Sequence, residues 1–441
     1  MASVTQAVIL AGGKGTRLAS VLGGKPKPLV NVGGTPLLEW QIRLLLRHGI
    51  DNIVVLVNHE AQQIERFVAG LNRSNARISI IDDGKPRGTA GAVLAVLDRL
   101  ADRFLVVYGD TMINVDLTRF IDAHRRGKFD ATLFIHPNDH PQDSDIVEVG
   151  DDGLIRAFHP YPHPPGSWLP NAVNAALYVI EKEALIPFAS HAQPCDFAKE
   201  LFPEMLDAGA RLGAYQSFEY VKDVGTPERL SKVERHLASG LIGRANLGRK
   251  QRAVFLDRDG TINVHAGFIR DIEALRLLPD VGEAVRRLND LEYRVVIATN
   301  QPVVARGELT MTELRRFHAK LETLLAQSGA YLDAILVCPH HPDRGFAGEV
   351  AALKIDCDCR KPKIGLVVQA VDLLNIDIEA SWFVGDTTSD MLTAKNAGLH
   401  SILVRTGEAG QDGKYEVTPD FVADNLLAAV DVIAGSSPVL R

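Results

Sequence analysis

Short apolar runs alternate with amphipathic segments along most of the chain, and this alternation constrains the fold more than any other feature. Strands that alternate with helices of about 10–15 residues predict βαβ units and a mostly parallel sheet. We therefore expect an α/β protein. The predicted strands are 7–10, 53–57, 78–81, 104–108, 253–256, 295–298, 334–337, 381–384 and 401–404, and the predicted helices of the first half are 37–47, 60–71 and 90–100.

The pattern is interrupted once, at the stretch ASGLIGRANLGRKQR, residues 238–252. This stretch is rich in glycine and basic residues and lacks a clear apolar face, which is typical of a linker. A new βα series starts directly after it. The sequence therefore predicts two doubly wound α/β domains, 1–240 and 253–441, joined by a linker at 241–252.

Composition narrows the classes of partner. The chain has 441 residues, of which 23% are charged and 46% hydrophobic, and its net charge is −7. This charge argues against a nucleic-acid partner. We find no apolar run near the roughly 18 residues of a membrane helix, and no basic segment before the first apolar run as in a signal peptide. We expect a cytoplasmic protein that binds small molecules, and the sequence is compatible with an oligomer.

The first predicted strand leads into a glycine-rich turn, VILAGGKGTRL, residues 8–18. Such turns usually bring backbone N–H groups close to a phosphate. A P-loop would need lysine after its last glycine, but Thr16 follows Gly15 here. A dinucleotide-binding turn would need a third glycine where Leu18 stands.

The turn and five later stretches resemble the sugar-1-phosphate nucleotidyltransferases. The pattern LAGGxGTRL is followed by Lys27-Pro-Leu, and VVYGD ends in Asp110. RGTAGAV, NAVNAALYVI and DVGTP complete the set, with Arg87 where leucine is usual and Ala176 where glycine is commoner. The resemblance covers residues 8–230 and is greatest to the heptose- and mannose-1-phosphate guanylyltransferase group.

This resemblance implies that a sugar 1-phosphate attacks a nucleoside triphosphate, and the guanylyltransferase group implies GTP as the donor. Arg17 suits the leaving β- and γ-phosphates because its fork binds phosphate bidentately, and Lys27 would lie near the transferred phosphate. Asp110 and Asp223 would hold Mg²⁺. The implied phosphate, base and sugar contacts are Gly12, Gly13, Gly15, Thr16, Gly88, Thr89 and Asn174.

The second half begins with AVFLDRDGTIN, in which a strand delivers Asp257 and Asp259 two residues apart. Residues at this spacing face the same side of a strand. The pattern DxDGT resembles the haloacid dehalogenase phosphatases, and their later motifs follow in order. These motifs supply Thr299, Asn300, Arg360, Lys361, Asp386 and Asp390.

The chemistry of a phosphomonoesterase assigns the roles. Asp257 would be the nucleophile that forms an aspartyl-phosphate, and Asp259 the general acid and base. Mg²⁺ would be held by Asp257, the backbone carbonyl of Asp259, and Asp386. Thr299 and Lys361 would bind phosphoryl oxygens, with Asn300 beside them, and Asp390 would support the metal site.

Three of the four cysteines fall in CPHHPDRGFAGEVAALKIDCDCRKP. Cys338-x-His340 and Cys357-x-Cys359 supply a sound ligand set for structural zinc. His341 competes with His340, which we prefer because Cys-x-His matches the zinc loop of the phosphatase family. The alternative is a set of buried or redox cysteines.

The zinc loop and TNQPVVARGELT make the second half similar to the heptose 1,7-bisphosphate and histidinol-phosphate phosphatases. Arg306 and Arg360 would grip a second phosphate, in an open site with the zinc loop as one wall. Joined to the first half, a heptose phosphatase would supply heptose 1-phosphate for nucleotidyl transfer. Two alternatives are a mannose-type transferase fused to an unrelated or histidinol-phosphate-like phosphatase, and a chain with one idle, regulatory half.

Overall fold

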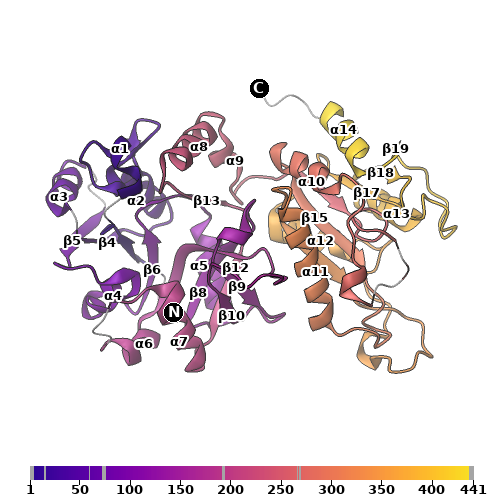
Figure 1. Ribbon diagram of the computed structural model, residues 1–441, viewed down its shortest axis with the longest axis horizontal. Helices are drawn as coiled ribbons and strands as arrows, with labels where there is room; N and C mark the ends of the chain where they lie inside the picture. The colour runs from indigo at the N-terminus through magenta and orange to yellow at the C-terminus, as the bar shows by residue number, and fades with distance from the viewer. Residues whose placement is uncertain are drawn as a thin grey trace. The chain divides into compact units, whose positions relative to one another are not determined.

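The computed structural model describes residues 4–13, 16–58, 60–71, 76–190, 194–265, 267 and 270–436. The chain forms two compact units (Figure 1). Unit 1 comprises Met1–His136, Ser144–Tyr161 and Ala172–Leu247. Unit 2 comprises Pro137–Asp143, Pro162–Asn171 and Gly248–Arg441.

The described strands of unit 1 include a nine-stranded sheet in the order β10-β9-β11-β6-β1-β4-β5, with β8 on β11 and β12 on β8. The neighbours β6, β1, β4 and β5 are parallel, and β11 runs antiparallel to β6. The strands are β1 (Gln6–Leu10), β4 (Asn52–Val57), β5 (Arg77–Asp82), β6 (Arg103–Tyr108), β8 (Ala131–His136), β9 (Ile146–Val149), β10 (Ile155–His159), β11 (Val173–Glu181) and β12 (Leu212–Gln216).

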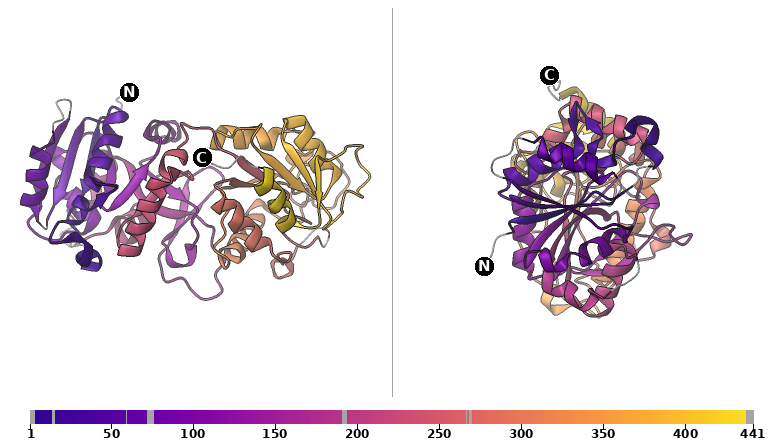
Figure 2. Two further views of the ribbon diagram at one scale, coloured as in Figure 1. Left: turned by 90° about the horizontal axis from the view of Figure 1, so that it is seen from above. Right: turned by 90° about the vertical axis from the view of Figure 1, so that its left-hand side faces the viewer.

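Successive residues of β1 point to opposite faces of this sheet, and each face is buried. Val8 packs in a core with α4 (Gly88–Leu94), and Ile9 packs in a second core with α2 (Leu37–Arg47) and α5 (Leu117–Gly127). In the right-hand view of Figure 2, the strands cross the centre of unit 1 and helices lie on both sides. This is the doubly wound arrangement that the βα pattern predicts.

A two-stranded sheet of β7 (Thr111–Asn114) and β13 (Tyr220–Asp223) lies in the same unit. Buried side chains of these two strands form a small core with helix α8 (Pro227–Ala238) and with α9 (Leu241–Arg244), which follows α8 in the chain. The stretch that composition predicts as a linker therefore includes a short helix. Three apolar side chains of this glycine-rich stretch, Ile242, Ala245 and Leu247, are buried and hold it against unit 1.

Unit 2 contains a six-stranded sheet in the order β16-β15-β14-β17-β18-β19, and every described pair in it is parallel. Val254 and Leu256 pack in a core with helices α10, α11 and α14, whereas Phe255 stacks on Phe383 on the opposite face. The strands are β14 (Ala253–Leu256), β15 (Arg294–Asn300), β16 (Ala334–Cys338), β17 (Trp382–Gly385), β18 (His400–Val404) and β19 (Phe421–Ala423). The helices are α10 (Val281–Asp290), α11 (Met311–Ala326), α12 (Gly365–Leu374), α13 (Thr388–Ala397) and α14 (Leu426–Ser436).

The structure confirms the α/β prediction and refines several bounds. The predicted helix at 37–47 is α2, but the one at 60–71 shortens to α3 (Ala61–Ala69). The one predicted at 90–100 becomes α4 followed by a separate 3₁₀ turn, Leu97–Arg99. Among the described residues, no helix has the length and apolar character needed to cross a bilayer.

Candidate active sites and metal centre

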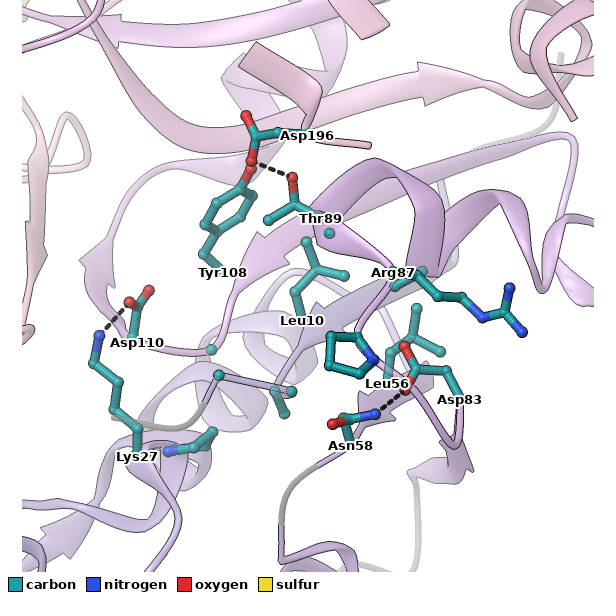
Figure 3. Close-up of a pocket in the computed structure, with 18 residues that line it drawn as sticks. Leu10, Lys27, Leu56, Asn58, Asp83, Arg87, Thr89, Tyr108, Asp110 and Asp196 are labelled. Carbon is teal, nitrogen blue, oxygen red and sulfur yellow. Dashed lines mark hydrogen bonds and ion pairs between the residues drawn. The ribbon is translucent and has the colours of Figure 1, made fainter. Parts of the chain in front are cut away.

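A pocket of about 570 Å³ opens at the carboxyl edge of the sheet in unit 1 (Figure 3). In open α/β sheets, ligands bind at this edge because the loops after parallel strands converge there. Gly12 follows β1, Asn58 follows β4, Asp83 follows β5 and Asp110 follows β6. The predicted residues that line the pocket are Gly12, Gly13, Lys27, Gly88, Thr89 and Asp110.

Three charged side chains predicted for phosphate or metal binding lie near Gly225. A Cβ added at this glycine would lie 2.8 Å from Asp223 Oδ1, 3.6 Å from Lys27 Nζ and 3.8 Å from Arg17 Nη2. Lys27 in turn forms an ion pair of 2.5 Å with Asp110. The glycine of the DVGTP stretch therefore leaves room where two cations and two carboxylates converge.

Asp110 and Asp223 are joined through the backbone as well. The Val224 N–H donates to the Asp110 carbonyl over 2.9 Å, and the Arg229 guanidinium donates to Asp223 Oδ1 over 2.7 Å. Burial acts to raise the pKa of Asp223, but the Arg229 hydrogen bond and charge outweigh it and hold this pKa below its usual value. Asp223 is thus an anionic oxygen donor of the kind that Mg²⁺ prefers.

The predicted nucleobase loop is fixed by the segment at 195–197. The Cys195 carbonyl accepts from the N–H groups of Ala90 and Gly91, and a Cβ at Gly88 would collide with this carbonyl. The Thr89 hydroxyl donates to Asp196 Oδ2 over 2.7 Å. These contacts hold residues 88–91 in one conformation where Gly88 and Thr89 line the pocket.

Four other positions that the sequence analysis singles out have different outcomes. Asn174 donates from Nδ2 to the Tyr178 hydroxyl and is not among the residues that line the pocket. Ala176, two residues on, has φ 55°, the left-handed region that favours glycine, at a register shift in β11. Gly15 and the side chain of Thr16 lie outside the described residues.

The sequence motifs do not identify four polar residues that line this pocket. Asn58 and Asp83 join through an Nδ2–Oδ1 hydrogen bond of 2.8 Å, and Tyr108 and Asp196 line the opposite part. Asn58 and Asp83 could have been suspected because each directly follows a predicted strand, β4 or β5. That they lie side by side follows only from the parallel pairing of these two strands.

A second pocket, of about 540 Å³, lies at the carboxyl edge of the sheet in unit 2. Asp257 follows β14, Thr299 and Asn300 end β15, and Asp386 follows β17. All the predicted catalytic and phosphate-binding residues of this half line it, namely Asp257, Asp259, Thr299, Asn300, Arg306, Arg360, Lys361 and Asp386.

A buried lysine organises the carboxylates of this site. Lys361 Nζ lies 2.8 Å from Asp257 Oδ1 and 2.6 Å from Asp390 Oδ1. Burial alone would lower the pKa of Lys361, but the two carboxylates outweigh it and raise this pKa. Asp390 Oδ2 accepts from both the N–H and the hydroxyl of Thr387, so Asp390 anchors Lys361 instead of lining the pocket.

Asp386 completes a group of acidic oxygens that could hold a cation. One oxygen each from Asp257, Asp386 and Asp390 lie within 4.8 Å of one another. Asp386 Oδ2 accepts from the Glu408 N–H, whereas its buried Oδ1 has no hydrogen-bond partner among the described residues. Burial raises the pKa of Asp386 to about 8 and that of Asp257 to about 6. A divalent cation would satisfy the unpartnered oxygen and stabilise both anions.

Two distant glycines enclose the Asp386 carboxylate. A Cβ added at Gly260 or at Gly407 would collide with Asp386 Oδ2. Gly260 belongs to the DRDGT motif, whereas Gly407 lies in the turn after β18. The backbone at both glycines therefore lies close to the same oxygen of the Asp386 carboxylate.

Asp259 is held by its neighbours. Its oxygens accept from Arg258 Nη2, Asn263 Nδ2 and Gln301 Nε2 at 2.8–3.0 Å. Burial acts to raise the pKa of Asp259, but the Arg258 charge and these hydrogen bonds hold it below its usual value. Asp259 is therefore a carboxylate in the free enzyme, the form that can accept a proton as a general base. Gln301 Nε2 also donates to Thr299 Oγ1 over 2.9 Å, which links Asp259 to the end of β15.

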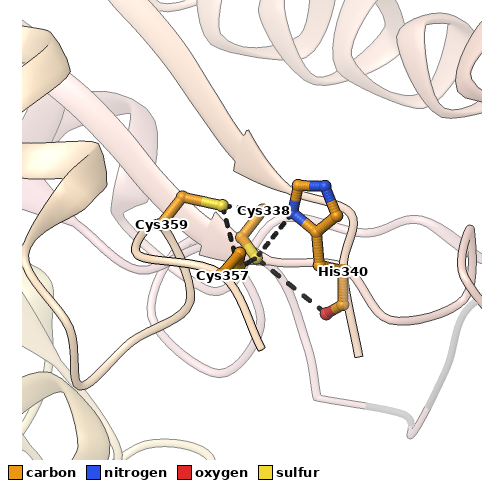
Figure 4. Close-up of side chains that lie close together, drawn as sticks. All are labelled: Cys338, His340, Cys357 and Cys359. Carbon is orange, nitrogen blue, oxygen red and sulfur yellow. Dashed lines mark hydrogen bonds between the residues drawn. The ribbon is translucent and has the colours of Figure 1, made fainter. Parts of the chain in front are cut away.

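The predicted zinc ligands form a cluster (Figure 4). One ligand atom from each of Cys338, His340, Cys357 and Cys359 lie within 4.8 Å of one another. The contacts are 3.5 Å for Cys338–Cys357, 3.2 Å for Cys357–Cys359 and 3.2 Å for Cys359 Sγ to His340 Nδ1. Zn–S bonds of about 2.3 Å in a tetrahedron place sulfurs about 3.8 Å apart, so the set fits zinc after small shifts.

His341 takes no part in this cluster. Its Nδ1 accepts from the Asp343 N–H, and the residue lines the pocket of unit 2. The loop at 339–356 also contacts Arg306, whose guanidinium lies 4.6 Å from the centroid of the Phe346 ring. Lys354 Nζ lies 4.4 Å from the same ring, and the Val350 N–H donates to the Ala305 carbonyl. The loop therefore forms a wall beside Arg306.

Known proteins resemble each half. The nucleotidyl transferase family model matches residues 6–240, and a HAD-hydrolase-like model matches residues 358–429. The D-glycero-beta-D-manno-heptose-1,7-bisphosphate 7-phosphatases of Yersinia pestis and Salmonella typhi are 39% and 41% identical over 175 residues, which are 40% of this chain and 90% of each relative. Among solved structures, HddC from Yersinia pseudotuberculosis matches with a TM-score of 0.46 and 25% identity, and covers 53% of this chain and 100% of that one.

The folds and sites define an enzyme with two phosphate-transfer domains, a nucleotidyltransferase and a haloacid dehalogenase-like phosphatase. The chain belongs to the nucleotidyl transferase family and to the family of D-glycero-beta-D-manno-heptose-1,7-bisphosphate 7-phosphatases.

Proposed function

We propose that the chain carries out two consecutive steps toward a nucleotide-activated heptose, in the cytoplasm. It removes the 7-phosphate of D-glycero-D-manno-heptose 1,7-bisphosphate and then transfers a nucleoside monophosphate, from GTP, to the heptose 1-phosphate. The observation that carries this proposal is the presence, on one chain, of a nucleotidyl transferase match and of 39% identity to heptose bisphosphate phosphatases. The phosphatase site in unit 2 would produce a sugar 1-phosphate, and the transferase site in unit 1 would use a sugar 1-phosphate as its substrate.

In the phosphatase step, Asp257 attacks the phosphorus of the 7-phosphate, and the bond from phosphorus to the sugar oxygen breaks. When the substrate phosphate binds, its negative charge offsets the charge of Arg258 and raises the proton affinity of Asp259, which takes up a proton from solvent. Asp259 donates this proton to the leaving oxygen. Asp259 then takes a proton from the water that hydrolyses the aspartyl-phosphate. Lys361 and Thr299 bind the phosphoryl oxygens, while Arg306 and Arg360 bind the 1-phosphate. Mg²⁺ held by Asp257, the Asp259 carbonyl and Asp386 would screen the charge of the two anions.

In the transferase step, an oxygen of the sugar 1-phosphate attacks the α-phosphorus of the nucleotide and pyrophosphate leaves. The groups of this chain position the reactants and neutralise charge. Lys27 binds the transferred phosphate, Arg17 binds the leaving phosphates, and the backbone at Gly12 and Gly13 borders the triphosphate. Mg²⁺ held by Asp110 and Asp223 would neutralise the phosphate oxygens.

The test is to incubate the protein with heptose 1,7-bisphosphate, Mg²⁺ and each nucleoside triphosphate separately. We expect release of inorganic phosphate in every case and of pyrophosphate with GTP. No phosphate release would overturn the phosphatase assignment. Asp257→Asn should abolish phosphate release from the bisphosphate but leave pyrophosphate release intact when heptose 1-phosphate and GTP are supplied. Asp110→Asn should abolish that pyrophosphate release and leave phosphate release from the bisphosphate intact. A variant that kept its activity would show that the assignment of that half is wrong.

We also propose that Cys338, His340, Cys357 and Cys359 hold a structural zinc ion, because the four ligands leave no open position. Cys357→Ser should abolish the zinc content of the purified protein, measured by atomic emission. Cys195→Ser is the matched control, since Cys195 is buried in unit 1. Equal zinc in the two variants would contradict this assignment.

A further inference from the structure

A buried arginine holds the carboxylate that the proposed phosphatase step uses as acid and base. Arg258 stands between Asp257 and Asp259 in the sequence, and only 4% of its side chain is exposed. Its Nη2 donates to the two oxygens of Asp259 over 3.0 and 2.8 Å and to Gln301 Oε1 over 3.0 Å. One nitrogen of the guanidinium is therefore committed to Asp259 and its neighbour.

The other terminal nitrogen of this guanidinium faces a histidine from a distant part of unit 2. Arg258 Nη1 lies 3.4 Å from Nε2 of His318, which is buried on helix α11. A guanidinium carries only N–H donors, so His318 Nε2 is the acceptor and the neutral ring carries its proton on Nδ1. Burial and the Arg258 charge keep the ring neutral, because they lower the pKa of His318 to about 3.

His318 has no place in the chemistry described so far. It is not among the described residues that line the pocket of unit 2, so its influence on the reaction has to pass through Arg258. The guanidinium is planar and rigid, and a contact that fixes Nη1 also fixes the direction of Nη2.

We propose that His318 is a positioning residue of the phosphatase, which holds Arg258 and, through it, the Asp259 carboxylate in the geometry for proton transfer to the leaving oxygen; this inference rests on the proposed function. Without the imidazole acceptor, Nη1 would be a buried donor that lacks a partner, which is unfavourable. The guanidinium would then turn toward other acceptors, and a substrate phosphate is a strong one. His318 prevents this loss of Asp259 to the substrate's own charge.

The experiment uses the leaving group to isolate proton transfer. A sugar oxygen needs a proton in order to leave, whereas p-nitrophenolate is a stable anion and leaves without one. His318→Phe keeps a ring but removes the acceptor. We expect kcat/KM for heptose 1,7-bisphosphate to fall about 10- to 100-fold, as for a small displacement of a catalytic group. The kcat/KM for p-nitrophenyl phosphate should change by less than about 3-fold, because its first step does not depend on Asp259 as an acid.

His318→Gln is the matched control, since its Oε1 can accept from Arg258 in place of Nε2. This variant should recover most of the wild-type kcat/KM for the bisphosphate. His318→Leu, which also lacks an acceptor, serves in place of His318→Phe if that variant does not fold.

A double variant checks that His318 acts through Arg258. Arg258→Lys keeps the positive charge, but a single ammonium group cannot reach Asp259, Gln301 and His318 together. Adding His318→Phe to Arg258→Lys should cause no further fall in kcat/KM for the bisphosphate, because His318 then has no guanidinium to hold.

Three results would overturn the role of His318 and leave the proposed function standing. They are full activity of His318→Phe on the bisphosphate, equal losses on the two substrates, and losses that multiply in the double variant. A wild-type protein that released no phosphate from the bisphosphate would overturn the proposed function and this inference with it.

Discussion

Ala176 shows what a departure from a family pattern means at the level of one residue. Its φ of 55° places an L-residue in a region that costs about 1–2 kcal/mol. The sequence comparison flags only that glycine is commoner here; the backbone conformation supplies the physical reason.

We expect Ala176→Gly to stabilise unit 1 by about 0.5–1 kcal/mol, because the relief of backbone strain exceeds the entropy that glycine adds to the unfolded chain. The measurement is the urea midpoint for loss of pyrophosphate release. Ala175→Gly is the control: Ala175 is buried in β11 without a positive φ, so this change should destabilise. A lower urea midpoint for Ala176→Gly than for the wild-type protein would contradict the inference that the backbone at Ala176 is strained.

Glu219 is a buried carboxyl in unit 1 and accepts from the N–H groups of Asp116 and Leu247 and from the Ser217 hydroxyl. Burial raises its pKa from 4.5 to about 7. The folded state therefore holds a proton that the unfolded state has lost between these pH values. The contribution of this group to stability is complete below pH 4.5 and is lost as the pH rises to about 7.

Glu219→Gln removes the titration. The free energy of unfolding of the wild-type protein minus that of the variant should fall as the pH rises from 4.5 to 7, measured by urea unfolding at a series of pH values. Parallel pH profiles for the two proteins would show that Glu219 does not titrate in this range.

At the level of elements, the loop at 339–356 does more than connect the Cys338–His340 and Cys357–Cys359 pairs, because its Phe346 ring contacts the Arg306 guanidinium. We expect Phe346→Ala to raise KM for the bisphosphate about 3- to 10-fold, as expected for loss of one cation–π contact. KM and kcat for a monophosphate ester without a second phosphate should stay unchanged. Phe346→Tyr keeps the ring and should restore the wild-type KM; equal effects on both substrates would point to a general loss of structure.

Local patterns predicted most of the elements and the residues that line the phosphatase pocket, because strand-end motifs place catalytic groups directly after apolar runs. Helix α2 matches its predicted bounds for the same reason, since its apolar spacing is regular. Asn58 and Asp83 escaped prediction because they are 25 residues apart and meet only through the parallel pairing of β4 and β5. The buried anchors at 242–247 escaped because glycine and basic residues dominate that stretch.

At the scale of the whole molecule, the described residues that line each candidate site belong to one compact unit. An equimolar mixture of Asp257→Asn and Asp110→Asn should therefore convert heptose 1,7-bisphosphate and GTP to the nucleotide sugar, after a lag while heptose 1-phosphate accumulates. Chromatography of the nucleotide products checks this. Absence of product from two variants that are each singly active would show that the intermediate does not pass through solution.

The two glycines around Asp386 bear on how this enzyme tolerates change. Gly260 and Gly407 are far apart in the sequence, yet a methyl group on either would displace the same carboxylate. A saturation scan scored by phosphatase activity should therefore rank Gly407 with the catalytic aspartates, although Gly407 is not among the described residues that line the pocket. Substitutions at the two positions should therefore impair the enzyme in the same way, by displacing Asp386 Oδ2. Intolerance to substitution at Gly407 would then report the space that this carboxylate needs and not a catalytic role of the glycine.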